Sequence, residues 1–144
     1  MTLAAGERAT VQVVVTEADT AIAAGSGDVP VLATPRLLAL AEAACVAAIA
    51  PHLPAGMTSV GTAVSLEHRH ACPVGAEVTV EAELTELDGR RLVYSFIARQ
   101  TGPPPASGGT PPTDAGEELV VGAGRVERVV VDRAKFLARA APAG

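Results

Sequence analysis

Hydrophobic and polar positions alternate along much of the chain, and this alternation predicts β-strands. The runs that show it cover residues 10–16, 58–70, 77–87, 90–100 and 118–131. From Val78 to Leu84, apolar residues at every second position alternate with polar ones, which places one face of the strand in the core and the other in water. We therefore predict a half-solvated antiparallel sheet.

The longest apolar run, Arg36–Ala50, contains neither Gly nor Pro and predicts a helix. Thr34 and Pro35 form a helix start, because Thr is a good N-cap and Pro suits the first helical position. Pro51 ends the helix. The run is apolar on almost every side, so other structure must surround it. The pattern predicts an α+β fold in which a curved antiparallel sheet wraps one long central helix.

Turn and loop residues separate these elements. Asp88-Gly89 tolerates positive φ and predicts a hairpin between the third and fourth strands. The stretch 19–31 is expected to be a loop, and the Pro- and Gly-rich stretch 101–116 a flexible hairpin connection. Asp132 is expected to cap a short terminal helix over 133–141.

The length and composition indicate one domain spanning residues 1–144. The chain is 49% hydrophobic but has only one Tyr, two Phe and no Trp, so Ala, Val and Leu must build the core. Small side chains bury little apolar area each, and further burial through oligomerisation is therefore expected.

The charge and the N-terminus exclude several functional classes. A net charge of -5 without a dense Lys/Arg cluster argues against binding to nucleic acid. We see no signal-peptide pattern and no apolar run of membrane-spanning length, which favours a soluble cytoplasmic protein. Cys45 and Cys72 have neither metal-ligand spacing nor the pattern of a disulfide framework.

Glu42 is the most anomalous residue, because its neighbours on the predicted helix leave it no polar face. An ionised carboxylate buried without a partner costs several kcal/mol, so this one must be protonated, paired or exposed to a wet cleft. Perturbed carboxylates are enriched at functional sites. The simpler interpretation places Glu42 at a solvent-facing helix edge or in a pair with Arg36.

Thr34 and His68 are further candidates, each with a simpler interpretation. Thr34 suits an N-cap, although a hydroxyl at a helix N-terminus also favours developing negative charge on oxygen. His68 and His70 share one strand face, and a histidine there can exchange protons near neutral pH or be purely structural. The His-Arg-His segment lacks a four-ligand set, so we expect no metal site.

Several motifs together resemble the hotdog thioesterases of the fluoroacetyl-CoA thioesterase type. They are A-T-x7-E-x-A-C-V at 33–46, A-P-x-L at 50–53, G-T-A-V-x3-H at 61–68, P-x-G-x-x-V-T-V-x-A-E-L at 73–84 and D-G-R-R-L at 88–92. A G-x-x-x-R tract before Val129 and the tail containing Phe136 match more loosely. The resemblance covers roughly residues 30–100 well.

The resemblance implies a hotdog fold and hydrolysis of an acyl-CoA. It implies that Thr34, Glu42 and His68 form a catalytic triad, with the histidine reaching the site from the partner subunit of a homodimer or larger oligomer. It also implies that the backbone near Gly61 supplies an N–H donor. No cofactor is implied beyond the CoA thioester substrate.

Two alternatives share this fold, and one departure affects the substrate. The alternatives are a non-catalytic module that binds an acyl-CoA or another small ligand, and a hydratase or dehydratase acting on an acyl thioester. The family's fluoroacetyl-specific enzyme has an aromatic lid residue just before the threonine, whereas residues 28–32 here contain no aromatic. The sequence therefore predicts a short acyl-CoA substrate with an unspecified acyl group.

Overall fold

The structure is a computed structural model that describes residues 3–102 and 119–142. Its elements follow one another as β1 (Arg8–Val14), η1 (Glu17–Asp19), α1 (Ala21–Ala24), α2 (Thr34–Ile49), η2 (Ala50–His52), β2 (Met57–His68), β3 (Glu77–Asp88), β4 (Arg91–Gln100), β5 (Leu119–Asp132) and α3 (Arg133–Ala140). The five predicted strands and the central helix are all present. The expected flexible connection at 101–116 lies almost entirely outside the described residues.

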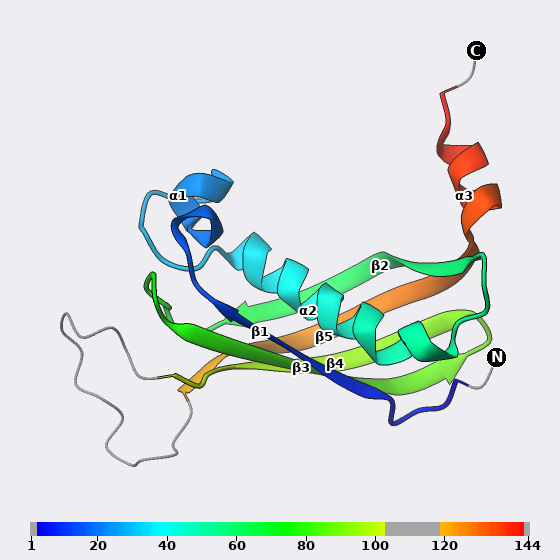
Figure 1. Cartoon of the computed structure of the whole chain (residues 1–144), viewed down its shortest axis with the longest axis horizontal. Coiled ribbons are helices and arrows are strands. Elements are labelled where there is room, and N and C mark those ends of the chain that lie inside the picture. The colour runs from blue at the N-terminus through cyan, green and yellow to red at the C-terminus, as the bar shows by residue number, and fades with distance from the viewer. Residues whose placement is uncertain (1–2, 103–118, 143–144) are drawn as a thin grey trace.

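The strands form one antiparallel sheet in the order β1-β3-β4-β5-β2, and α2 lies across one face of it (Figure 1). The β3–β4 hairpin turns at Gly89, where φ is +58°, which confirms the turn predicted at Asp88-Gly89. Among the described strands, β2 pairs only with β5 and lies at an edge of the sheet. Two of the candidate residues, Gly61 and His68, lie on this edge strand.

The core lies between α2 and the concave face of the sheet. The predicted alternation in β3 is confirmed, because every second residue from Val78 to Leu84 is fully buried. Tyr94 and Phe96 on β4 add the two large aromatic side chains. The helix contacts β1 and β3 more extensively than β2. The concave face of β2 is therefore left partly uncovered, and Val64 is 48% exposed.

Two expectations about local structure were wrong. The stretch 19–31 is not all loop, because Thr20 caps the four-residue helix α1 and Gly25 ends it in the left-handed conformation. Helix α2 also begins at Thr34 with Ala33 at its N-cap, so Thr34 is not the capping residue. The terminal helix agrees with prediction, since the Asp132 side chain accepts from the Lys135 backbone N–H.

One expectation about membranes also needs correction. The helical run Thr34–His52 is 19 residues long with a mean hydropathy of 1.3, which is long and apolar enough to cross a membrane by these measures. The core helix of a soluble protein passes the same test. Here the run packs along the sheet, and Leu37, Ala44 and Ile49 are fully buried. Its apolar character is thus accounted for by contacts within the fold.

Candidate active site

Thr34 and His68 form a hydrogen-bonded pair where the start of α2 meets the end of β2. Thr34 lies in the first turn of α2 and His68 is the last residue of β2, and the distance from Thr34 Oγ1 to His68 Nδ1 is 2.8 Å. Both residues belong to the same chain. The resemblance implied that the histidine reaches the site from the partner subunit; within the described residues, the antiparallel course of α2 and β2 brings His68 to Thr34 of its own chain.

The start of α2 explains why the Thr34 hydroxyl is available. A capping side chain would accept an N–H of the first turn, but the N-cap is Ala33, which makes no side-chain bond. Pro35, the next helical residue, has no N–H to offer. The hydroxyl of Thr34 is directed to the imidazole instead. The simpler interpretation of Thr34 as a capping residue is thus wrong.

The environment of His68 favours its neutral form. Burial lowers the pKa of His68; a hydrogen bond to the His70 backbone opposes this shift, and the His70 side-chain charge adds to it, so the pKa lies below its usual value. With a neutral ring, Nδ1 accepts the Thr34 hydroxyl proton and Nε2 carries the ring hydrogen. Nε2 is buried and has no hydrogen-bond partner among residues 3–102 and 119–142. A buried donor of this kind calls for an acceptor from substrate, water or a second chain.

Glu42 is paired, as one of the sequence interpretations required, but its partner is Arg128 rather than Arg36. Arg128 Nη1 donates to Glu42 Oε2 at 2.7 Å, and the side chains are 9% and 32% exposed respectively. Arg36 instead pairs with Asp19. Only one of the two carboxylate oxygens is bound to Arg128.

Two hydrogen bonds to Ser59 hold the Arg128 side chain in place. Its Nε donates to Ser59 Oγ at 3.0 Å and its Nη2 to the Ser59 backbone oxygen at 2.8 Å. These bonds hold the guanidinium across β5 and β2. The orientation of Glu42 is thus set by a buried arrangement of three side chains.

Gly61 lies directly against Glu42. A Cβ built on Gly61 would stand 2.5 Å from Glu42 Oε2 and 3.5 Å from Arg128 Nη1. A side chain at this position would displace the carboxylate, so glycine is required by close approach. The register of β2 against β5 shifts between Gly61 and Ala63. The Glu42 carboxylate therefore lies beside a β-bulge in the edge strand β2.

The four predicted residues form two separate groups within one chain. Thr34 and Glu42 are eight residues apart on α2, which is roughly 12 Å along the helix axis. Thr34 and His68 border a cleft of about 320 Å³ that the 21–32 segment and residues 69–71 also line. Glu42 and Gly61 are absent from its described lining. One chain therefore brings Thr34 to His68 and Glu42 to Gly61, but does not bring the two pairs together.

Sequence reasoning missed Arg128 and Ser59. A signal for Arg128 was available, because Val126, Arg128 and Val130 share the inward face of a strand. A cation among inward-facing valines is the same kind of anomaly as Glu42 among alanines, with opposite charge. Matching the two anomalies would have predicted the pair. Ser59 offered no comparable signal, since serines occur throughout such strands.

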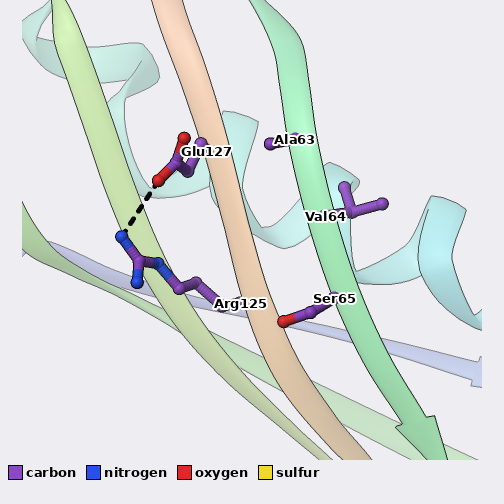
Figure 2. A pocket seen from close by; sticks show the side chains of 5 residues that line it. All are labelled: Ala63, Val64, Ser65, Arg125 and Glu127. Atoms are coloured by element: carbon purple, nitrogen blue, oxygen red, sulfur yellow. Dashed lines mark hydrogen bonds and ion pairs between the residues drawn. The ribbon is translucent and has the colours of Figure 1, made fainter.

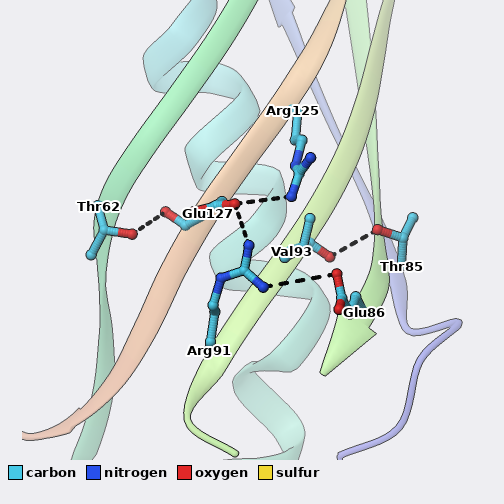
Figure 3. A network of polar contacts seen from close by, with 7 residues as sticks. All are labelled: Thr62, Thr85, Glu86, Arg91, Val93, Arg125 and Glu127. Atoms are coloured by element: carbon cyan, nitrogen blue, oxygen red, sulfur yellow. Dashed lines mark hydrogen bonds and ion pairs between the residues drawn. The ribbon is translucent and has the colours of Figure 1, made fainter. Parts of the chain in front are cut away.

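Other polar groups occupy the opposite face of the sheet. A cavity of about 210 Å³ at the β2–β5 edge is lined by Ala63, Val64, Ser65, Arg125 and Glu127 (Figure 2). Glu127 accepts hydrogen bonds from Arg91 at 2.6 Å and from Arg125 at 2.9 Å. Figure 3 shows this network. Both arginine side chains are more than 40% exposed. This surface network has no histidine or hydroxyl in nucleophile–base geometry.

Metal and thiol chemistry receive no support from the described residues. Residues 3–102 and 119–142 contain no group of three or more His, Cys, Asp and Glu side chains arranged to hold a metal ion. Cys45 and Cys72 are buried free thiols. Burial raises the pKa of Cys45 to about 12 and that of Cys72 to about 11, so both remain protonated.

Comparison with known proteins places this geometry in context. Residues 15–108 match the model of the fluoroacetyl-CoA-specific thioesterase family. Over 109 residues the chain is 38% identical to a fluoroacetyl-CoA thioesterase of Streptantibioticus cattleyicolor, covering 76% of this chain and 67% of that protein.

Solved structures give the same result. A fluoroacetyl-CoA thioesterase structure matches with a TM-score of 0.79 and 34% identity, covering 96% of this chain and 95% of the other. A hot-dog-like protein from Thermanaerovibrio acidaminovorans matches with a TM-score of 0.74 and 23% identity over 94% and 89% of the two chains. The predicted hotdog fold is confirmed.

Proposed function

The chain belongs to the fluoroacetyl-CoA-specific thioesterase family, and from this premise we propose that Thr34, Glu42 and His68 form its hydrolytic centre. The protein is a thioester hydrolase that acts on acyl-CoA. The observation that carries the assignment of residues is the 2.8 Å contact between Thr34 Oγ1 and His68 Nδ1. Nucleophile and base within hydrogen-bond reach are the minimum that acyl transfer needs.

The reaction proceeds in two steps. Thr34 Oγ1 attacks the thioester carbonyl carbon while His68 Nδ1 takes the hydroxyl proton, and that proton then goes to the departing CoA sulfur. The product is CoA and an acyl ester of Thr34. Water, deprotonated by His68, hydrolyses the ester and releases the free acid. Burial keeps His68 neutral and thus able to accept protons at neutral pH.

The backbone at Gly61 and the Glu42 side chain have different roles in this reaction. The negative charge that develops on the carbonyl oxygen requires N–H donors, and removal of one such donor typically slows a reaction by about 10² to 10³. Glu42 is held by Arg128 through one of its two carboxylate oxygens. Its role is to accept the hydrogen of His68 Nε2, which has no acceptor among the described residues of its own chain.

This arrangement needs a second copy of the chain. The free edge of β2 is suited to antiparallel pairing with its own symmetry mate, because an unpaired strand edge presents open N–H and C=O groups. A two-fold axis passing between Val64 and Ser65 places Gly61 of one chain opposite His68 of the other. The exposed Val46 and Val64, at 45% and 48%, become buried there. We therefore propose a homodimer with two composite sites, and higher oligomers built from it.

The acyl group is short. The relative from Streptantibioticus cattleyicolor is named for fluoroacetyl-CoA, whose acyl group has two carbons. The cleft beside Thr34 is lined by small and medium-sized side chains, Ala21, Val29, Val31 and Leu32 among them, and has a volume of about 320 Å³. No aromatic residue stands between 28 and 32 to select a fluorinated group.

The proposed reaction uses only side chains and water. We propose that it requires no cofactor or metal besides the CoA thioester, and that nucleic acid and membranes are not partners. A cytoplasmic location is supported by Cys45 and Cys72, which are free thiols as expected in a reducing compartment.

A thiol-release assay over a panel of acyl-CoA esters tests the proposal. We expect Thr34→Ala, Glu42→Gln and His68→Ala each to lower kcat by about 10² to 10⁴ for the best substrate, whereas Arg36→Gln, on the same helix, leaves it within twofold. Mass spectrometry of rapidly quenched enzyme should find the acyl group on Thr34. Acylation of Glu42 would reassign the nucleophile.

Two results would exclude hydrolysis. Equilibrium binding of CoA esters without turnover, unchanged in Glu42→Gln, would leave a binding module. Hydration of an enoyl thioester without thiol release would indicate a hydratase. Light scattering that finds a fully active monomer would exclude the composite site while leaving the hydrolase in place.

A further inference from the structure

Helix α3 stands away from the rest of the fold. It leaves the end of β5 and extends past the free edge of β2 (Figure 1). Its eight residues are all exposed, and it is attached at its base by the bond from Arg133 N to Gly56 O and by the Asp132 cap. A helix this short is marginal in water by itself, so contacts beyond the chain are needed to hold it.

The cations of α3 differ from most other cations in the described part of the chain. Ion pairs with carboxylates engage Arg8, Arg36, Arg69, Arg91, Arg125 and Arg128. Arg133, Lys135 and Arg139 of α3 form no ion pair with the described residues. The chain as a whole carries a net charge of -5. Three of the eleven Lys and Arg residues therefore lie together on α3, where they are available to an external anion.

Two exposed apolar patches lie at opposite ends of β2. The first, on α3, consists of Phe136 and Leu137, which are 38% and 58% exposed. The second, beside the Thr34–His68 cleft, consists of Ile22 and Val29, which are 56% and 49% exposed. The α3 patch begins beside Met57, which is opposite Asp132 in the β2–β5 register, whereas the cleft patch lies beyond His68.

The proposed dimer brings the two patches together. Two-fold pairing about the middle of β2 places the Met57 end of one chain beside the His68 end of the other. Because α3 extends past this edge, the proposed pairing would bring it to the end of the partner subunit that carries the 21–31 segment. The inference thus rests on the proposed function and its composite site, and it adds a contact that β2 pairing alone does not make.

The substrate requires positive charge at this place. The cleft, at about 320 Å³, is at the small end of ligand-site volumes of about 300 to 1,000 Å³, and CoA is larger than most drug-sized ligands. The phosphate-bearing nucleotide end must therefore lie outside it. The cleft's own rim carries Asp28, and its Arg69 is already paired with Glu67. The rim within one chain thus offers little to bind phosphates.

We propose that α3 of each subunit packs through Phe136 and Leu137 on the 21–31 segment of the partner and binds the phosphate groups of CoA with its basic side chains. The helix closes the mouth of the partner's cleft on one side. Acyl group and phosphates are then held by different subunits. Arginine and lysine bind phosphate through charge-assisted hydrogen bonds that salt weakens.

Kinetics of Lys135→Gln/Arg139→Gln test the phosphate contact. Two exposed charge contacts are together worth about tenfold, so KM for the best acyl-CoA should rise about tenfold at low ionic strength with kcat within twofold. For the N-acetylcysteamine thioester of the same acid, which lacks phosphate, KM should not change. Arg8→Gln/Arg125→Gln removes the same charge from the opposite face of the sheet and should leave both KM values unchanged.

The outcomes separate this inference from the proposed function. Wild-type turnover with an unaltered KM in the α3 variant overturns the phosphate contact alone. Equal KM increases for the CoA ester and the phosphate-free thioester also overturn it, because the helix would then act on the fold. Failure of the wild type to hydrolyse any acyl-CoA overturns the proposed function together with the inference.

Cross-linking tests the contact between subunits. Val29→Cys/Leu137→Cys should form a disulfide-linked dimer on mild oxidation, whereas either single variant should remain monomeric on a non-reducing gel. Cys45 and Cys72 are buried and do not interfere. A cross-link within one chain, or none in a protein that is dimeric by light scattering, overturns the docking of α3.

Discussion

The two faces of the sheet each carry a group of paired arginine and glutamate side chains, and the two groups differ in how deeply they are buried. On the concave face, Arg128 is 9% exposed and binds one carboxylate, Glu42, and one serine. On the convex face, Arg91 and Arg125 are 41% and 53% exposed and share Glu127. Water screens the charges of the convex group and can replace each of its hydrogen-bond partners. The buried Arg128 is shielded from water, so protein groups must supply its hydrogen bonds.

The comparison teaches that burial, rather than the number of ion pairs, decides what a charged group contributes. Burial of the Arg128 pair costs desolvation energy that its hydrogen bonds only partly recover, so stability alone gives little reason to keep it. Its benefit is a carboxylate fixed beside Gly61. The convex network, by contrast, provides a polar surface and constrains no reactive group.

Arg128→Leu should give the largest effect. It leaves Glu42 half-buried without its cation, and we expect a loss of about 3 kcal/mol in the free energy of unfolding, with at least about a hundredfold loss in kcat. Urea unfolding and the thiol-release assay measure the two. The double variant Glu42→Leu/Arg128→Met should recover stability but not activity. If the double variant were as unstable as Arg128→Leu, desolvation would not explain the loss.

Gly61→Ala comes next. Its Cβ would overlap Glu42 Oε2, so the carboxylate must move, and we expect kcat to fall about a hundredfold with a stability loss of about 1 to 2 kcal/mol. Thr62→Ala, the next residue along β2, is the control and should retain normal kcat. Equal rates for the two variants would show that the position of Glu42 is not critical.

Glu127→Gln probes the convex network and should cost less than about 1 kcal/mol without changing kcat. The wild-type contribution should also diminish in 1 M salt, because exposed charges are screened. A loss comparable to that in Arg128→Leu would remove the distinction between the two faces.

The smallest effect concerns pH. Burial lowers the folded-state pKa of His68 below 6.5, so below that pH the unfolded chain binds a proton that the folded chain does not. The free energy of unfolding should therefore rise with pH up to about 6.5 and gain nothing further from this group above it. Unfolding curves at several pH values should show a flatter rise for His68→Gln than for His70→Gln. An unchanged slope in His68→Gln would contradict this assignment.

The sequence predicted the sheet and α2 well because their signals are local. Alternation from Val78 to Leu84 reports burial directly, and Asp88-Gly89 determines a turn from two residues. Helix α1 was missed because four residues show no helical periodicity and only Thr20 and Gly25 mark its ends.

The site was less predictable because its contacts are long-range. Glu42 could be recognised as an anomaly on its own helix, yet its partner Arg128 lies 86 positions along the chain. The Thr34–His68 bond spans 34 positions, and only the family resemblance linked these residues. Local capping rules even favoured the wrong role for Thr34, since they cannot include a competing imidazole.

Ala33, the N-cap residue of α2, lowers the stability of the helix in a way that favours reaction at Thr34. A Ser or Asp at the N-cap of α2 would strengthen the helix by about 1 kcal/mol, and Ala forgoes that gain. No N-cap side chain then offsets the positive end of the helix dipole next to the Thr34 oxygen. Attempts to improve thermal tolerance by conventional helix capping would offset that dipole. The uncapped N-terminus of α2, at Ala33, is thus a position that protein engineers should leave unchanged.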